Sequence, residues 1–241
     1  VSYILRQGSP SNQVALYLPT HDALAMVAGG KTNLFENIRD LVGPDFLPHM
    51  INSGFNPEFV DDAVINAASI SDQSLKTANT GYRAIVLPSI ERIPLDTLNK
   101  LSAFAAAGGI VIATDRMPSL APGYLDKGET KVRDLASRLF VSENAVVKRE
   151  DIGKTLAGRL APELRFTVGS QDLGYIKRRL GFADVYFIAN TSNQSITTEA
   201  NFGKTGLFPE VWNPVSGAVL PADYDRNSAG ERRAGDGRRH G

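Results

Sequence analysis

The chain has 241 residues, 42% of them hydrophobic, which is enough for one large domain or two modest domains with apolar cores. Its 26 acidic and 26 basic residues balance, and no apolar run approaches the roughly 20 residues of a membrane-spanning helix, so neither nucleic acid nor a membrane is an expected partner. The absence of cysteine excludes disulfides, thiolate metal sites and a cysteine nucleophile.

Apolar strand-like runs and amphipathic helical stretches alternate over the first two-thirds of the chain. The apolar run at 14–19 ends at a proline and fits a strand that is buried on both faces. A helix is predicted at 33–43, because Asn33 can cap its start and Gly43 can end it. A further helix is predicted at 57–68.

The clearest structural signal is a strand–helix–strand unit at 84–114. Its helical segment places Leu95, Leu98 and Leu101 at helical spacing between two apolar strands. Such a unit implies parallel strands joined by a right-handed crossover. Repeated along the chain, it predicts an α/β domain with a doubly wound parallel sheet, flavodoxin-like in broad class. Further predicted elements are helices at 130–140 and 153–162 and short strands at 145–149 and 164–168.

The pattern changes after about residue 170, where strand-like runs are separated by Gly, Asn, Ser and Pro. Residues 183–202 are interpreted as two strands joined by a polar turn, because apolar and polar positions alternate in their second half. We therefore predict an α/β domain at 1–170 and a small, incomplete antiparallel β-module at 171–222. The stretch 223–241 has few apolar residues and is predicted to be a disordered tail.

Doubly wound sheets bind ligands beyond the carboxyl ends of their strands, and polar side chains follow three of the predicted strands. His21 beside Asp22 suggests acid–base work at this edge. The alternative, which we favour, is that these are ordinary loop residues and helix caps. The candidates for a substrate-rim or interface role are His21, Asp22, Glu91, Arg92, Asp115 and Arg116, with Ser89 beside them.

Other polar and aromatic features are predicted to be structural. Asp61 and Asp62 are adjacent on a predicted helix and point about 100° apart, so a solvated helix face is the favoured interpretation. Trp212 suits a hydrophobic core better than a sugar-stacking surface. The three histidines are scattered and no nucleotide-binding motif is complete, so no cofactor or metal is predicted within this fragment.

Three segments together resemble a known arrangement of domains. The entry to the first strand and the stretch "AIVLPSIERIPLDTLNKLSAFAAAGGIVIATDRMP" resemble the glutamine-amidotransferase-like domain found after the catalytic barrel in several large glycoside hydrolases. Tyr186, Phe187 and Asn190, followed by "PEVWNPVSG", resemble the β-module that follows this domain in the α-L-rhamnosidases of glycoside hydrolase family 106. The resemblance covers roughly residues 2–222.

The resemblance implies a non-catalytic C-terminal portion of an enzyme that hydrolyses terminal α-L-rhamnosides. The catalytic carboxylates, with a calcium ion, would lie in an upstream barrel that no segment here matches, so no catalytic residue can be assigned. The implied location is periplasmic or extracellular, although the chain, which begins at Val1, carries no signal peptide. The implied partners are the upstream barrel of the same chain, carbohydrate and a homo-oligomer.

Two alternatives remain beside this interpretation. One is a free-standing binding or oligomerisation module without catalysis, and the other is a small hydrolase that uses His21 and Asp22. Glutamine amidotransferase activity is excluded, because active members of that superfamily use a cysteine nucleophile and this chain has none.

Overall fold

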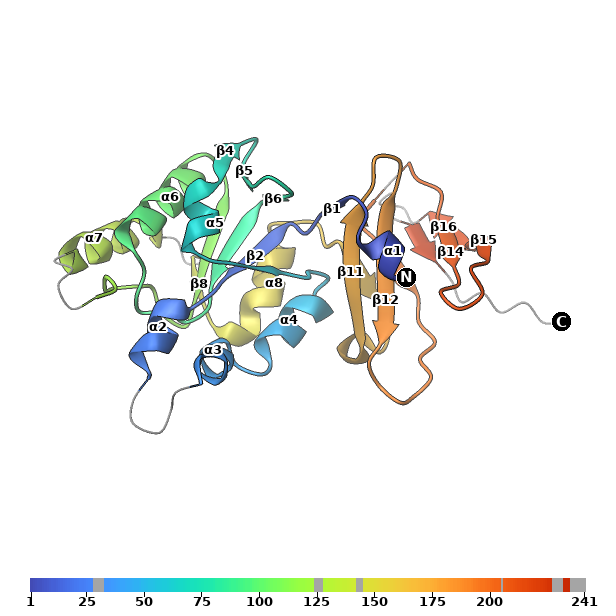
Figure 1. The fold of residues 1–241 in the computed structure, drawn as a ribbon, viewed down its shortest axis with the longest axis horizontal. Coiled ribbons are helices and arrows are strands. Elements are labelled where there is room, and N and C mark those ends of the chain that lie inside the picture. The colour runs from blue at the N-terminus through green and yellow to red at the C-terminus, as the bar shows by residue number, and fades with distance from the viewer. Residues whose placement is uncertain (28–32, 124–127, 142–144, 205, 227–231, 235–241) are drawn as a thin grey trace.

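The computed structural model describes residues 1–27, 33–123, 128–141, 145–204, 206–226 and 232–234. Figure 1 shows two parts, with most of the helices and the parallel sheet at the left and a group of antiparallel strands, orange to red, with the short α1 beside them, at the right. The predicted fold class, an α/β domain followed by a small antiparallel β-module, is confirmed.

The α/β domain is built on a five-stranded sheet in which all four strand pairs are parallel. Four-residue strands such as β7 can be buried completely because every side chain is apolar. The sheet order is β3 (Glu58–Val60), β2 (Val14–Tyr17), β7 (Ala84–Leu87), β8 (Ile110–Thr114) and β9 (Val146–Val147).

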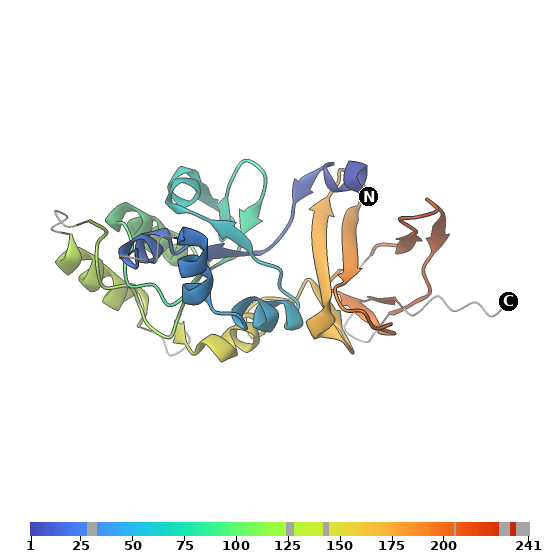
Figure 2. The same ribbon diagram turned by 60° about the horizontal axis from the view of Figure 1, so that its bottom comes forward.

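Helices cover both faces of this sheet, and consecutive strand residues pack into two separate cores. Ile85 and Leu87 join one core, whereas Ala84 and Val86 join the other, as the two-residue period of a strand requires. Figure 2 shows the helices on opposite sides of the sheet. One layer contains α5 (Asp62–Ala67), α6 (Leu95–Ala106) and α7 (Glu129–Leu139), and the other contains α3 (Leu34–Val42), α4 (Phe46–Asn52) and α8 (Ile152–Ala157).

Smaller elements complete this domain. The predicted helix at 57–68 is divided, because Phe59 and Val60 pair with β2 as part of β3 before α5 begins. The 12-residue α6 is the longest described helix, and none of them is long and apolar enough to cross a membrane. The remaining elements of this domain are α2 (Thr20–Ala25), the 3-10 turn Arg149–Asp151, and the sheet of β4 (Ser69–Ser71), β5 (Ser74–Lys76) and β6 (Gly81–Tyr82). Helix α1 (Ser2–Leu5) lies beside β11 and β12 in Figure 1, and the 3-10 turn Ser170–Asp172 directly precedes β11.

The β-module consists of three small antiparallel sheets. The first joins β1 (Ser9–Pro10), β11 (Leu173–Arg179) and β12 (Asp184–Asn190). The second has the order β10 (Leu164–Phe166), β13 (Ala200–Phe202), β17 (Arg232–Ala234) and β16 (Tyr224–Arg226), and the third pairs β14 (Glu210–Trp212) with β15 (Val219–Pro221). The module therefore uses β1 and β10, both from before residue 171.

Three predictions for this module need correction. Residues 183–202 do not form one hairpin, because β12 pairs with β11 while β13 pairs with β10. The stretch 223–241 contains the strands β16 and β17, whereas the rest of the predicted tail, 227–231 and 235–241, lies outside the described residues. Trp212 is not in a core: it is 50% exposed, and its indole Nε1 donates a hydrogen bond to Glu210 Oε2 over 3.0 Å.

Candidate functional site

The candidate residues follow β2, β7 and β8 at the carboxyl edge of the sheet, as predicted. Helix α2 begins directly after β2 and carries His21 and Asp22. The two loops after β7 and β8 each contain a residue with positive φ, Ser89 at 46° and Asp115 at 61°. Non-glycine residues adopt this conformation at an energetic cost, so the surrounding contacts hold both turns in place.

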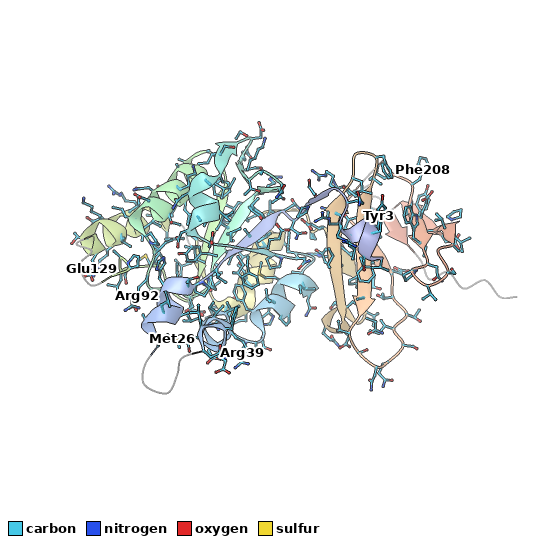
Figure 3. The ribbon with its side chains drawn as sticks, viewed as in Figure 1. Tyr3, Met26, Arg39, Arg92, Glu129 and Phe208 are labelled. Carbon is cyan, nitrogen blue, oxygen red and sulfur yellow. The ribbon has the colours of Figure 1, made fainter. Side chains whose placement is uncertain are left out.

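Asp22, Glu91 and Arg92 lie together, and Asp22 is their centre. Asp22 Oδ2 accepts hydrogen bonds from the backbone amides of Glu91, at 2.7 Å, and Arg92, at 3.1 Å. The Arg92 guanidinium donates to Asp22 Oδ1 at 3.0 Å and to Glu91 Oε2 at 2.9 Å. The Asp22 side chain is only 4% exposed, so this carboxylate clamps α2 to the loop after β7. Figure 3 shows Arg92 beside α2.

His21 contacts Asp62 at the start of α5, and not its neighbour Asp22. His21 Nε2 lies 2.9 Å from Asp62 Oδ2, and the two side chains are 28% and 26% exposed. Asp62 Oδ1 accepts hydrogen bonds from the Tyr17 hydroxyl at 2.9 Å and from Thr97 Oγ1 at 2.6 Å. Burial, followed by the charge of Asp62, raises the pKa of Tyr17 above its usual range. Tyr17 therefore stays a hydrogen-bond donor at neutral pH.

Asp115 and Arg116 are held separately from the Asp22 group. Asp115 Oδ1 accepts from the backbone amide of Arg149 at 3.0 Å, and its Oδ2 accepts from Arg149 Nε at 3.1 Å. Arg116 Nε donates to the carbonyl oxygen of Ser89 at 2.8 Å. Sequence reasoning missed Arg149, although its position after the short strand β9 was a signal that it lies at the same edge.

The chemistry available at this edge is limited, because its charged groups bond to one another. Asp22 uses its two oxygens on an arginine and two backbone amides, and Asp115 uses its two oxygens on an arginine and one backbone amide. Asp62 bonds Tyr17, Thr97 and His21. A glycosidase needs carboxyl groups that can reach the glycosidic oxygen and the anomeric carbon. Among the described residues, no group of three or more His, Asp or Glu side chains could hold a metal ion such as calcium.

The adjacent residues Asp61 and Asp62 give a direct test of this network. Asp61 caps α5 through the backbone amide of Val64 at 2.9 Å, so Asp61→Ala is expected to cost about 1 kcal/mol of stability. Asp62→Ala leaves the Tyr17 hydroxyl and Thr97 without their acceptor and is expected to cost about 2–3 kcal/mol. Urea denaturation of both variants measures the difference, and equal losses would contradict it. We predicted that Asp61 and Asp62 lie on a solvated helix face. This is wrong for Asp62, because its carboxylate bonds Tyr17, Thr97 and His21.

Comparison with known proteins gives consistent matches. The family model described as alpha-L-rhamnosidase matches residues 1–226. A curated protein of Formosa agariphila, named "Putative beta-glucuronidase", is 24% identical over 188 residues, which are 76% of this chain and 16% of that protein. The solved structure of a rhamnosidase from Novosphingobium sp. PP1Y has a TM-score of 0.71 and 22% identity, over 97% of this chain and 22% of that one. The chain thus spans less than a quarter of either protein.

Proposed function

Because the chain belongs to the alpha-L-rhamnosidase family of glycoside hydrolases, glycoside hydrolase family 106, we propose that it forms the C-terminal, non-catalytic part of such an enzyme. In this proposal the catalytic barrel precedes it in a longer protein and carries the carboxylates and the calcium. The small share of both similar proteins that the chain covers leaves room for such a barrel. The family also favours a secreted protein, and we propose a periplasmic or extracellular location.

The observation that carries a non-catalytic role is the pairing of the carboxylates at the sheet edge. Asp22 is held by an arginine and two backbone amides, and Asp115 by an arginine and one backbone amide, so neither is free to act as a general acid or base. His21 is bonded to Asp62, and no serine or cysteine is paired with it among the described contacts. The edge is suited to a rim or an interface that supports the barrel, with carbohydrate as a neighbour.

The division of labour can be tested with an aryl α-L-rhamnoside. The 241-residue chain alone is expected to give no turnover, whereas the longer protein is expected to hydrolyse the substrate. His21→Ala in the longer protein is expected to leave kcat within about twofold, since His21 is assigned no chemical step. Turnover by the chain alone that disappears in His21→Ala would overturn the proposal. The proposal is supported if the longer protein is active and the 241-residue chain alone is inactive.

A free-standing binding or oligomerisation module is the second candidate, and one observation favours it. Strands β14 and β15 expose several large apolar side chains, among them Val211, Trp212 and Leu220. Tyr3 and Phe208, labelled in Figure 3, are also exposed in this half of the molecule. Such surface normally contacts another protein surface. Light scattering separates the candidates, because a self-assembling module forms dimers or larger species without any barrel.

A further inference from the structure

A cavity of about 680 Å³ lies where the α/β domain meets the β-module. Its walls come from both parts: Ser74 and Arg83 from one side, Lys177 and Tyr186 from the other, and residues 8–13 between them. Figure 2 shows the chain passing from β1, beside β11, into the α/β domain at this junction. Cavities of this size hold small molecules, and sites at domain junctions are common.

Unsatisfied polar atoms concentrate in the wall of this cavity. Among the described residues, the buried side-chain polar atoms without a hydrogen-bond partner are Asn12 Oδ1, Glu163 Oε2 and Tyr186 Oη. All three residues line this one cavity. Asn12 Oδ1 and the carboxylate oxygen Glu163 Oε2 only accept hydrogen bonds, and the hydroxyl Tyr186 Oη can also accept one. Buried polar groups in native proteins are normally paired. These three atoms are shielded from solvent, so a ligand that brings hydroxyl donors would pair them once their side chains turn toward the cavity.

The charge of the lining is predominantly positive. Arg83, Lys177, Arg179 and Lys204 line the cavity, against the single carboxylate of Glu163. Asp184 lies behind two of these cations, 3.5 Å from Arg179 Nε and 3.3 Å from Lys204 Nζ. Arg83 is exposed, and its guanidinium makes no hydrogen bond or ion pair within the described part of the chain. An anionic group is therefore the natural partner for Arg83.

We propose that this cavity binds an anionic saccharide unit, that is, a sugar ring that carries a carboxylate or a sulfate. Arg83 binds the anionic group, and the ring hydroxyls donate to the acceptors of Asn12, Glu163 and Tyr186 after these side chains turn toward the cavity. The preference for an anion rests on the residues of this cavity. The choice of a saccharide rests on the proposed function, in which the chain is part of a carbohydrate-degrading enzyme. The site lies in the junction, away from the carboxyl edge described above, and no step of hydrolysis is assigned to it.

Isothermal titration of the 241-residue chain tests the proposal with matched probes. Methyl glucuronide and glucose 6-sulfate are expected to bind saturably, and methyl glucoside, which lacks the charge, about tenfold more weakly. Arg83→Gln is expected to weaken binding of both anionic sugars about tenfold without affecting folding, because Arg83 is exposed. The control is Arg133→Gln on α7, an exposed arginine that does not line the cavity, and binding by this variant is expected to be unchanged.

Each other outcome overturns the proposal in a distinct way. The site is refuted if no probe binds saturably, or if Arg83→Gln and Arg133→Gln bind alike. Inorganic sulfate that binds as tightly as the two anionic sugars refutes the saccharide part of the proposal and leaves a simple anion site. The rhamnoside assay described above reports independently on the proposed function, because it measures catalysis by the longer protein. A failure of one proposal is thus distinguishable from a failure of the other.

Discussion

Replacing Asp22 with alanine is expected to lower the free energy of unfolding by about 3 kcal/mol. The reason is that Asp22 is buried and accepts three hydrogen bonds, two from backbone amides and one from the Arg92 guanidinium. Its removal leaves the amides of Glu91 and Arg92 without an acceptor and Arg92 without its buried counter-charge. We expect α2 and the loop after β7 to loosen together, since Asp22 joins them.

Urea denaturation near pH 7 measures this loss, and Asp40→Ala provides the control. Asp40 is 52% exposed and lies 3.6 Å from Arg39, so its ion pair is expected to contribute less than about 1 kcal/mol. Asp22→Asn keeps the size of the side chain but loses its charge, and we expect an intermediate loss. If Asp22→Ala and Asp40→Ala are equally stable, the clamp at the sheet edge does not stabilise the domain.

The substitution Lys177→Met at the domain junction is expected to cost about 3 kcal/mol near pH 8. Lys177 is 3% exposed, and its Nζ lies 3.8 Å from Oε1 of the buried Glu163. Burial lowers the pKa of Lys177, burial raises the pKa of Glu163, and each residue's charge partly offsets the effect on the other. Removing the lysine leaves the Glu163 carboxylate in the junction with the backbone amide of Gln13, 2.7 Å away, as its hydrogen-bond donor.

The loss from Lys177→Met should depend on pH in a defined direction. The folded-state pKa of Glu163 is already raised above its usual 4.5 and rises further without the lysine. At a pH between the unfolded-state pKa and the raised folded-state pKa of Glu163, the folded state binds more protons than the unfolded state. The free energy of unfolding therefore falls as pH rises through this range. The deficit of Lys177→Met is therefore expected to be larger near pH 8 than near pH 5.

A double variant supplies the control for this pair. Glu163→Gln in the Lys177→Met background removes the stranded carboxylate, and we expect it to recover about half of the lost stability and to abolish the extra pH dependence. Thermal or urea unfolding of the wild-type protein, the Lys177→Met variant and the double variant near pH 5 and near pH 8 measures these differences. A deficit in Lys177→Met that is the same at both pH values would contradict a charged Glu163 in the junction.

The α/β domain was predictable because its signals are local. Completely apolar runs such as 84–87 mark strands that are buried on both faces, and the helical spacing of Leu95, Leu98 and Leu101 marks the helix between two of them. Right-handed crossovers then specify that the strands are parallel, which also brings their polar ends to one edge. The positions of the candidate residues at that edge followed from this reasoning.

Partners in space were not predictable from the same signals. His21 contacts Asp62, 41 residues away, because β3 lies beside β2 and leads into α5. Nothing in the neighbourhood of His21 favours that partner over Asp22. Alternation in 195–202 likewise indicates which side of a strand is buried, but not which strand it pairs with. The structure separates β12 from β13 and places each beside an earlier strand.

The pairing of β1 with β11 changes how the two parts are connected. The chain starts in the β-module, leaves it for the α/β domain, and returns to it through β10. The α/β domain is thus an insertion within the β-module, tethered at both of its ends. Cutting the chain at Gln13 would isolate no autonomous unit: it would remove β1 and leave one edge of β11 bare, a surface prone to aggregate. Dissection of this protein must keep residues 1–12 attached to the β-module.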